Sequence, residues 1–551
     1  MLRPDFLPKN TWYFLFTLLG LVYLRGLFVP LMDNDSAHHA NIALHMHLTG
    51  DFVNLIDYGN DYLDKPHLHF WLAAFSYKLF GVTTFAYKFP SFLFTILGIW
   101  STFRLGQSLY NRETGKLAAL ILAASFAFIL ANNDVRMDAI LTASVAFATW
   151  QLIDLIKTRA FINIAGAALG LALSFATKGH IGVFVPVVSA FLYILYLKEY
   201  KLFYNWRWLA VIALFFVFIS PVIYCYYLQY NLHPEKIVRG RNNIDGIRFI
   251  LLDQSVGRFS GEMGSDAKND YFFFFHSFLW AFAPWSIVAY IAIVKSIRGV
   301  RSGKVEWMTA GTFIILALIV SFSGFKLPHY LNIVFPVTAV LTAAFFLHHR
   351  ENGPWIRRLL IIQGAMAFLL LALTAVINGW AFPVKTISMI IRVVLLLAIV
   401  FYFIKSKTYT SIQKTVLIPV AALIFCFALL NSNFYPQLLT YQGGNMLAAA
   451  SKGKVDYNNV YLWKETYSSS FNFYSATTRK TFHDSVINHS GDTWLLYDIR
   501  DEQNIKDSGY NVVQKFINLD YEITKLDLKF VNPKTRDTQC TKMVLGIITK
   551  K

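Results

Sequence analysis

The chain has 551 residues, of which 56% are hydrophobic, 17% aromatic and only 15% charged. Soluble domains carry about 25% charged residues, so this composition excludes an ordinary soluble protein and indicates an integral membrane protein. The net charge of +18 does not indicate nucleic acid, because basic cytoplasmic loops of membrane proteins produce the same excess. We expect no nucleic-acid partner.

Apolar runs predict about 13 membrane spans. In chain order they cover 12–30, 86–109, 116–132, 139–156, 161–177, 181–197, 207–228, 271–294, 306–323, 330–348, 356–378, 383–404 and 413–432. A shorter run, 67–80, is expected at the interface. Arg3 and Lys9 precede the first run, and no small-residue cleavage motif follows it. We therefore expect an uncleaved first span.

The connections between the runs alternate in charge. One set is rich in Lys and Arg, and the positive-inside rule places that set and the N-terminus in the cytoplasm. The other set, which includes 31–70, 132–138, 229–270 and 324–329, is then expected outside. The tail 436–551 follows the last run, and strand-like segments at 459–465, 493–500 and 519–531 predict a small α/β domain there. We expect residues 1–435 to form the membrane domain.

The first outer loop carries the most polar residues. DNDSAHHA follows the first span and places Asp33 and Asp35 at a helix start. Either carboxylate could act as a general base, or both could simply cap the helix. LDKPHLHFW places Asp64 and Lys65 before an apolar run, where a lysine can hold a phosphate or can extend its charge to the interface.

The remaining outer loops each add an ionisable side chain. RMDAILT, ATKG, QSVGRFSGEMG and FKLPHYLNIVFP supply Asp138, Lys178, Arg258, Lys326 and His329. Ionisable residues near membrane depth are functional candidates, although capping or surface charge explains any single one. Together they suit a substrate with an anionic head and a lipid tail. The histidines, including His38, show no zinc-ligand spacing, and we predict no metal ligands.

The order of these motifs resembles the GT-C type transferases of lipid-linked sugars. DSAHHA, LDKPHLHFWL with KLFGV, RMDAILT, ATKG and FKLPHYLNIVFP are similar to the 4-amino-4-deoxy-L-arabinose transferase family, which is related to the protein O-mannosyltransferases. The resemblance implies an inverting transfer of a sugar from a polyprenyl phosphate donor to a lipid, glycan or protein acceptor. It also implies a bacterial inner membrane with the site and the tail on the periplasmic face, and lipid A modification as one form of the activity.

The resemblance also implies roles for individual residues. Asp35 and Asp138 match the acidic catalytic positions, and Lys65 matches the lysine that binds the donor phosphate. Arg258, Lys178 and Lys326 match further basic positions around that phosphate, and the supporting residues are Asp33, Asp64, His38 and His329. The chain departs from the family where DSAHHA replaces Asp-Glu-x-Arg-Tyr-Ala and where Asp64 replaces a glutamate.

Two matters stay open at this point. The histidine that binds a metal with that glutamate in some members has no match in GSDAKNDYF, so no cofactor is assigned and a divalent metal stays an alternative. A transporter or flippase for a lipid-linked or anionic substrate is the competing function. Transporters usually place their charges near the midplane and use broken helices, whereas here the charges cluster at the outer mouth. We expect a monomer surrounded by membrane lipids.

Overall fold

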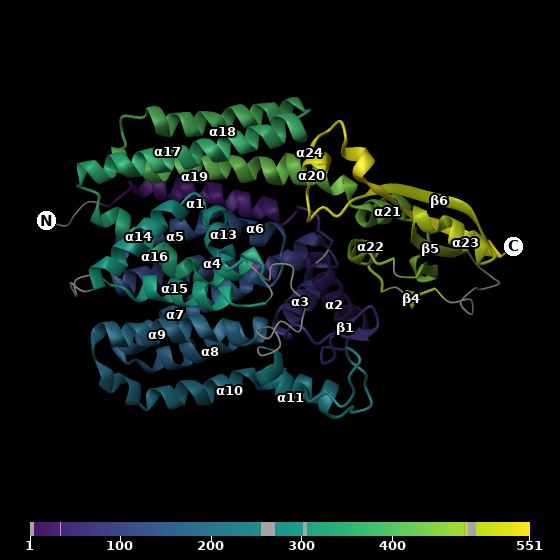
Figure 1. Ribbon diagram of the computed structural model, residues 1–551, viewed down its shortest axis with the longest axis horizontal. Coiled ribbons are helices and arrows are strands. Elements are labelled where there is room, and N and C mark those ends of the chain that lie inside the picture. The colour runs from purple at the N-terminus through teal and green to yellow at the C-terminus, as the bar shows by residue number, and fades with distance from the viewer. Residues whose placement is uncertain are drawn as a thin grey trace.

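The computed structural model describes residues 5–33, 35–254, 270–300, 306–324, 326–464, 466–478, 480–482 and 492–550. Long helices lie side by side along the longest axis, and a small sheet domain lies at one end of them (Figure 1). The two termini lie at opposite ends of this axis (Figure 1). The predicted fold class, a polytopic helical protein with a small C-terminal sheet domain, is therefore confirmed.

The first half of the membrane domain contains eleven described helices. They are α1 (Lys9–Gly26), α2 (Asp35–Thr49), α3 (Leu68–Phe80), α4 (Thr84–Leu109), α5 (Arg112–Ala123), α6 (Phe126–Asn133), α7 (Asp138–Thr158), α8 (Phe161–Lys178), α9 (His180–Leu197), α10 (Arg207–Tyr226) and α11 (Gly246–Arg248). The second half contains α13 (Phe273–Ala281), α14 (Ser286–Gly299), α15 (Met308–Ser321), α16 (Phe335–His348), α17 (Gly353–Ala375), α18 (Ile387–Lys405), α19 (Ser411–Leu429) and α20 (Tyr435–Leu438).

Every predicted apolar run falls on one of these helices or on two consecutive ones. Within the described ranges, eight helices are long and apolar enough to span a membrane, or up to nine if α5 and α6, bent by 53°, form one span. The predicted count of about 13 spans stays a prediction. The run 67–80 forms α3, which packs beside α2.

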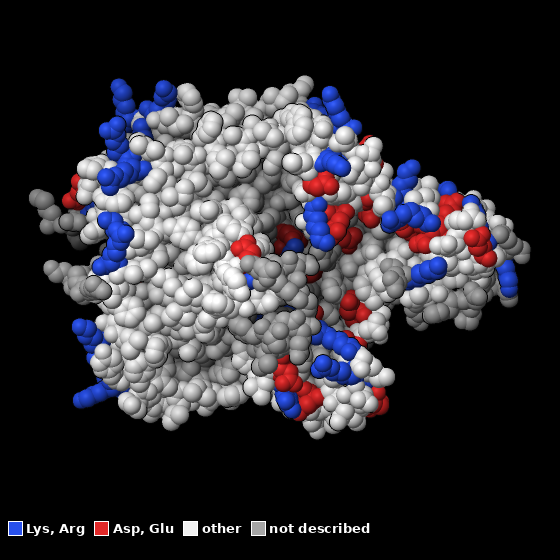
Figure 2. All heavy atoms as spheres, viewed as in Figure 1, with Lys and Arg blue, Asp and Glu red and all other residues white. Residues whose placement is uncertain are grey.

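Burial within the bundle separates central helices from peripheral ones. Most of α7 is buried (89% of its apolar window), whereas only 11% of that of α18 is buried. An apolar helix that is exposed on most sides is suited to contact lipid. Figure 2 shows a broad uncharged surface along the helices, Lys and Arg at the end that carries the N-terminus, and both charge signs at the opposite end. This distribution is the one that the positive-inside rule describes.

The C-terminal domain contains a five-stranded mixed sheet with the order β4-β3-β5-β7-β6. Its strands are β3 (Val460–Leu462), β4 (Lys480–Thr481), β5 (Thr493–Asp498), β6 (Tyr510–Asp520) and β7 (Thr541–Lys550), and α21 (Gly443–Ser451), α22 (Ser469–Tyr474), α23 (Glu502–Asp507) and α24 (Leu528–Val531) accompany it. β3 pairs in parallel with β4 and β5, and β7 pairs antiparallel with β5 and β6.

One predicted strand is wrong. Residues 519–531 alternate polar and apolar residues, yet β6 ends at Asp520 and the remainder forms a turn and α24. The carboxylate of Asp527 accepts a hydrogen bond of 2.7 Å from the N–H of Phe530 and caps this short helix. The ring of Tyr521 stacks on that of Phe530 with 3.8 Å between centroids. Local capping and stacking therefore outweigh the period-two pattern.

Hydrogen bonds join the sheet domain to the loop after α1. The side chain of Gln442 donates to the carbonyl of Leu31 (2.9 Å) and accepts from the N–H of Asp33 (2.8 Å). The N–H of Leu31 donates to the hydroxyl of Tyr474 at 2.8 Å. On the membrane side, the buried Lys88 donates to the carbonyls of Gly26, Val29 and Asn133. The segment before α2 is thus held from both sides.

Candidate active site

A polar cavity of about 240 Å³ lies where the starts of α2 and α7 and the end of α8 meet the segment before α16. Its wall consists of Asp35, His38, His39, Tyr62, Asp64, Lys65, Arg136, Met137, Asp138, Lys178, Leu327, His329 and Tyr330. The wall brings together seven of the ten residues that the sequence predicted for the site: Asp35, Asp138, Lys65, Lys178, Asp64, His38 and His329. We call it the cationic cavity after Lys65, Arg136 and Lys178, which line it together with three carboxylates.

Asp35 is the first residue of α2 and is held by an arginine. The Nη1 atom of Arg136 lies 2.9 Å from Oδ2 of Asp35, and its Nη2 atom lies 2.9 Å from Oδ2 of Asp134. The Asp35 side chain is 37% exposed, so its carboxylate is fixed in direction and remains accessible. Arg136 was not among the predicted site residues, although it lies in the same RMDAILT motif as Asp138.

Asp138 and Lys178 form a buried ion pair. Asp138 begins α7 and Lys178 ends α8, so each charge is placed favourably for its helix dipole. The Nζ atom of Lys178 lies 2.9 Å from Oδ1 of Asp138, with the two side chains 7% and 6% exposed. Nε2 of His329 lies 3.8 Å from the other carboxylate oxygen. The ion pair therefore links the start of α7 to the end of α8, in addition to any chemical role.

Three predicted site residues lie outside the cavity wall. Asp33 faces the C-terminal domain, where it accepts hydrogen bonds of 2.6 Å from the N–H and the hydroxyl of Ser470. Lys326 is buried, and its Nζ atom lies 5.4 Å from the centre of the Tyr271 ring. Arg258 lies outside the described residues. Within the wall, Asp64 pairs with Arg239 from the loop after α10.

The histidines of the first outer loop differ in environment. His39, His67 and His69 are buried, and burial lowers the pKa of His67 and of His69 to about 4. His38 is half-buried, with Nε2 at 2.8 Å from Oδ2 of Asp57. Burial alone would lower the pKa of His38, but the hydrogen bond and the charge of Asp57 outweigh burial and raise it. His38 is therefore the member of this group best suited to carry a charge.

An apolar cavity of about 370 Å³ adjoins the cationic cavity. Both share Asp138, Lys178, His329 and Tyr330 in their walls. The rest of the wall comes from α7, α9, α15 and neighbouring segments, and includes Leu141, Ile181, Phe184, Ile319, Val320 and Ile333. A charged compartment thus shares part of its wall with an apolar one between the helices, an arrangement that suits a ligand with a polar head and a hydrocarbon tail.

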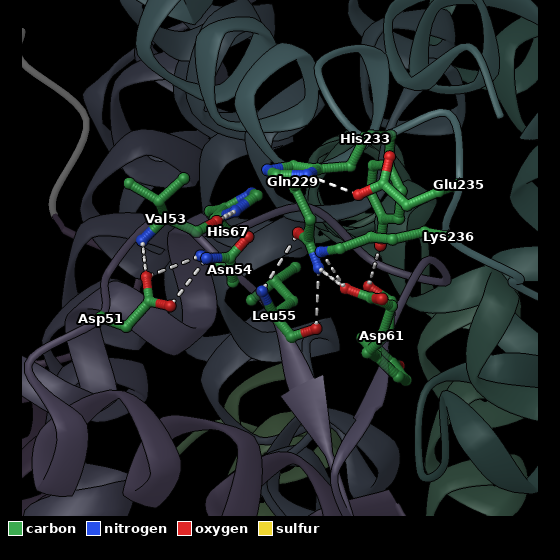
Figure 3. A network of polar contacts seen from close by, with 12 residues as sticks. Asp51, Val53, Asn54, Leu55, Asp61, His67, Gln229, His233, Glu235 and Lys236 are labelled. Carbon is green, nitrogen blue, oxygen red and sulfur yellow. Dashed lines mark hydrogen bonds and ion pairs between the residues drawn. The ribbon is translucent and has the colours of Figure 1, made fainter. Parts of the chain in front are cut away.

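A hairpin of β1 (Ile56–Asp57) and β2 (Asn60–Asp61) directly precedes Tyr62, which lines the cationic cavity. Figure 3 shows how the side chain of Gln229 braces it: the amide bonds both backbone groups of Leu55 at 3.1 Å and donates to Asp61 at 2.8 Å. Lys236 adds an ion pair of 3.0 Å to Asp61 (Figure 3). The loop after α10 therefore fixes the hairpin.

A third cavity, about 630 Å³, lies between this hairpin and the C-terminal domain. It shares His38 and Tyr62 with the cationic cavity. Its wall also contains Asp33, Asp57, Tyr58, Asn60, Asp61, Gln442, Tyr467, Ser469, Asp520, Tyr521, Glu522, Ile523, Thr524 and Met543. We call it the acidic cavity, because five carboxylates line it. The sequence predicted only Asp33 and His38 of this wall as site residues. About half of the wall comes from the distant C-terminal tail, and no sequence motif links that tail to the first loop.

Metal binding was left open by the sequence. Within the ranges that the structure describes, no group of three or more His, Cys, Asp and Glu side chains is placed to hold a metal ion. The nearest imidazole–carboxylate contact at the site, His38 with Asp57, is a hydrogen-bonded pair. No metal ligand is assigned, and no step below depends on one.

The fold and the site define a class of protein. Residues 64–225 match the family described as dolichyl-phosphate-mannose-protein mannosyltransferase, and the helical architecture is the GT-C fold. At 11% identity, the oligosaccharyltransferase of Archaeoglobus fulgidus has a TM-score of 0.50 over 90% of this chain and 70% of its own. The predicted resemblance to GT-C type transferases is confirmed at the level of the fold.

A more detailed likeness is to the aminoarabinose transferases. ArnT from Cupriavidus metallidurans, in a crystal structure with undecaprenyl phosphate bound, has a TM-score of 0.74 at 14% identity, over 98% of both chains. The undecaprenyl phosphate-alpha-4-amino-4-deoxy-L-arabinose arabinosyl transferase of Pseudomonas aeruginosa strain UCBPP-PA14 is 27% identical over 335 residues. That alignment covers 59% of this chain and 57% of the relative, so the matched part is little more than half of either protein.

Proposed function

We propose that the chain is a glycosyltransferase that moves a sugar from a polyprenyl phosphate donor to an acceptor at the outer membrane surface. The observation that carries this proposal is the junction of the cationic and apolar cavities at Asp138, Lys178, His329 and Tyr330. A lipid phosphate needs both compartments at once. A free sugar nucleotide or a soluble glycan would have no use for the apolar one.

The donor phosphate binds at Lys65 in this proposal. Lys65 lines the cationic cavity and lies close to the start of α3. It follows Asp64 in the sequence, whose carboxylate pairs with Arg239. An ammonium group at this point holds a phosphate by charge. Lys178 strengthens the positive field from the opposite wall, although its contact with Asp138 offsets part of its charge. The polyprenyl tail occupies the apolar cavity.

The transfer is a single displacement. An acceptor oxygen forms a bond to the anomeric carbon while the bond from that carbon to the phosphate oxygen breaks, and the polyprenyl phosphate leaves with the electron pair. The acceptor proton passes to the carboxylate of Asp35, which Arg136 holds in direction. The configuration of the anomeric carbon inverts. Asp138 orients Lys178 and, through its negative charge, favours the positive charge that develops on the sugar.

Several statements about the whole protein belong to this proposal. The basic end of the bundle is cytoplasmic, and the cavities and residues 436–551 face the periplasm of a bacterial inner membrane. This orientation is supported by the separation of charge in Figure 2 and by the positions of the termini in Figure 1. The membrane domain of residues 1–435 carries the donor site, and the protein acts as a monomer.

Mass spectrometry of lipids that co-purify with the protein tests the proposal. We expect polyprenyl phosphate with the wild type and the sugar-loaded form enriched with Asp35→Asn, because the donor binds but does not react. Lys65→Ala should retain about tenfold less of either lipid, as loss of one charged hydrogen bond predicts. Lys116→Ala, whose partner Asp5 lies at the opposite end of the bundle, is the control. Equal lipid in all four proteins, or none in any of them, would refute the donor site.

A further inference from the structure

We propose that the acidic cavity binds the acceptor, and that this acceptor presents an uncharged or positively charged sugar whose hydroxyl group, rather than a phosphate, attacks the donor. This inference rests on the proposed function and adds the chemical class of the second substrate. It is carried by the shape, charge and aromatic lining of a cavity that the donor does not need.

The position of the cavity fits a second substrate. The acidic cavity shares His38 and Tyr62 with the cationic cavity, so the two proposed ligands would lie next to each other. It has a volume of about 630 Å³, enough for a sugar unit with its neighbours, and it lies against the C-terminal domain rather than between membrane helices. An acceptor can therefore meet the anomeric carbon without passing the polyprenyl tail.

The charge of the cavity disfavours an anion. Five carboxylates line it and, of the residues described, no Lys or Arg does. Three of the five have a partner that can carry a positive charge: Asp57 pairs with His38, Asp61 with Lys236 and Glu522 with Lys525. Asp33 and Asp520 instead accept hydrogen bonds from uncharged donors, namely Ser470 and the N–H of Gly443. A phosphate placed here would meet like charges on several sides.

Hydrogen bonds compensate the burial of Asp33 and Asp520 only in part. Burial raises the pKa of Asp33 to about 6 in spite of its bonds to Ser470, and burial likewise raises the pKa of Asp520. The Oδ1 atom of Asp57 is buried without a hydrogen-bond partner in the part of the chain that the structure describes. Buried acceptors normally have donors. Hydroxyl or ammonium groups of a ligand in the cavity would add donors to Asp33 and Asp520, which line it.

The aromatic lining points to a sugar. Tyr58, Tyr62, Tyr467 and Tyr521 line the cavity, and the rings of Tyr58 and Tyr467 meet edge to face with centroids 5.0 Å apart. A pyranose presents a C–H face that packs on an aromatic ring and a rim of hydroxyl groups that donate to carboxylates. Tyrosines beside carboxylates therefore match both parts of a sugar. The donor cavity differs, because three cations balance its three carboxylates.

The reaction balances without a further reactant. The acceptor hydroxyl oxygen forms the new glycosidic bond, the bond between the anomeric carbon and the phosphate breaks, and the hydroxyl proton goes to Asp35. Because the product is then an acetal, it differs chemically from the glycosyl phosphodiester that a phosphate acceptor would give. The two products can be told apart by acid lability and by phosphorus NMR.

The experiment compares glycolipids and glycans from cells that express the wild type or Asp35→Asn. We expect a sugar present only with the wild type, linked to a carbon-bound oxygen, stable to mild acid and without a new phosphodiester signal. A sugar linked to phosphate, as on a phosphorylated glycolipid, would overturn the inference and leave the proposed function intact. No transfer in either strain, together with no donor lipid on the purified protein, would overturn both.

A charge reversal provides the second measurement. Glu522 lines the cavity with a 58% exposed side chain, so Glu522→Lys should fold normally. We expect it to lower transfer by about tenfold through the reversed local field, with the amount of co-purified polyprenyl phosphate unchanged. Glu235→Lys, also exposed (69%) and outside the cavity wall, is the matched control. Faster transfer with Glu522→Lys would show that the acceptor is an anion.

Discussion

At the scale of single residues, we expect the bundle to be sensitive to the loss of either partner of the buried Asp138–Lys178 pair. Asp138→Asn would leave the ammonium of Lys178 buried without a counter-charge. Removing one partner of a buried pair costs about 3–5 kcal/mol, so we expect a clear loss of thermal stability in detergent. Asp5→Asn, which breaks an exposed pair with Lys116, should cost under about 1 kcal/mol. Equal losses would mean that water already solvates Lys178.

Asp33 makes the attachment of the C-terminal domain depend on pH. Burial raises the pKa of Asp33 from an ordinary value of 3.8 to about 6, so the folded state binds this proton more tightly than the unfolded state. The resulting stabilisation is complete below pH 3.8 and is lost as the pH rises through 6. Asp33→Asn keeps an oxygen that can accept the hydrogen bonds from Ser470. Because the amide does not titrate, this variant should not lose that stabilisation as the pH rises.

The measurement is the melting temperature of both proteins at pH 5 and at pH 8. We expect the wild type to lose more stability than Asp33→Asn between these two values. Asp492→Asn, an exposed acid-to-amide change before β5, should follow the wild type. If Asp33→Asn shows the wild-type loss as well, another group causes it.

The predicted site residues divide according to how they are brought together. Asp35, Lys65, Asp138 and Lys178 could be predicted because each lies where an apolar run meets an outer loop, and the structure places all four in one wall. Asp57 could not, because its importance arises from contact with His38 and from a wall that the distant tail completes. No local pattern records such a contact.

At the scale of the elements, the crossing of α7 and α8 depends on a glycine. A Cβ atom at Gly170 would lie 2.7 Å from Cα of Ala148, so Gly170→Ala would force the two helices apart. Overpacking of this kind costs about 1–3 kcal/mol. Gly364→Ala in α17 meets nothing within 4 Å and should be neutral or stabilising. Thermal unfolding should show a lower melting temperature for Gly170→Ala than for Gly364→Ala. Equal melting temperatures would show that α7 and α8 can move apart at little cost.

The elements were predicted with unequal success for one physical reason. A helix in a membrane satisfies its own backbone and needs only a long apolar run, so each run is visible in the sequence. A strand needs a partner, and β6 and β7 pair with each other and with β5, which no single segment reveals. The incorrectly predicted strand at 519–531 shows the same limit, because alternating polar and apolar residues do not reveal whether a partner strand is present.

At the scale of the whole molecule, orientation can be tested by chemical labelling. Tyr204 is 91% exposed at the basic end, and Leu528 is 87% exposed in the C-terminal domain. In a Cys540→Ser background, we expect a membrane-impermeant maleimide to label Leu528→Cys in intact spheroplasts and Tyr204→Cys only after lysis. Cys225 and Cys426 are buried, so they give little background. The reverse pattern would invert the topology.

His38 and Tyr62 line both cavities, so the two proposed substrates would meet there, and each would reach this boundary by its own route. One route opens among the helices and the other beside the sheet domain, so neither ligand blocks the path of the other. Such an enzyme binds its substrates in either order and reacts only when both are present. Its double-reciprocal plots should therefore intersect rather than run parallel, and donor analogues should not compete with the acceptor.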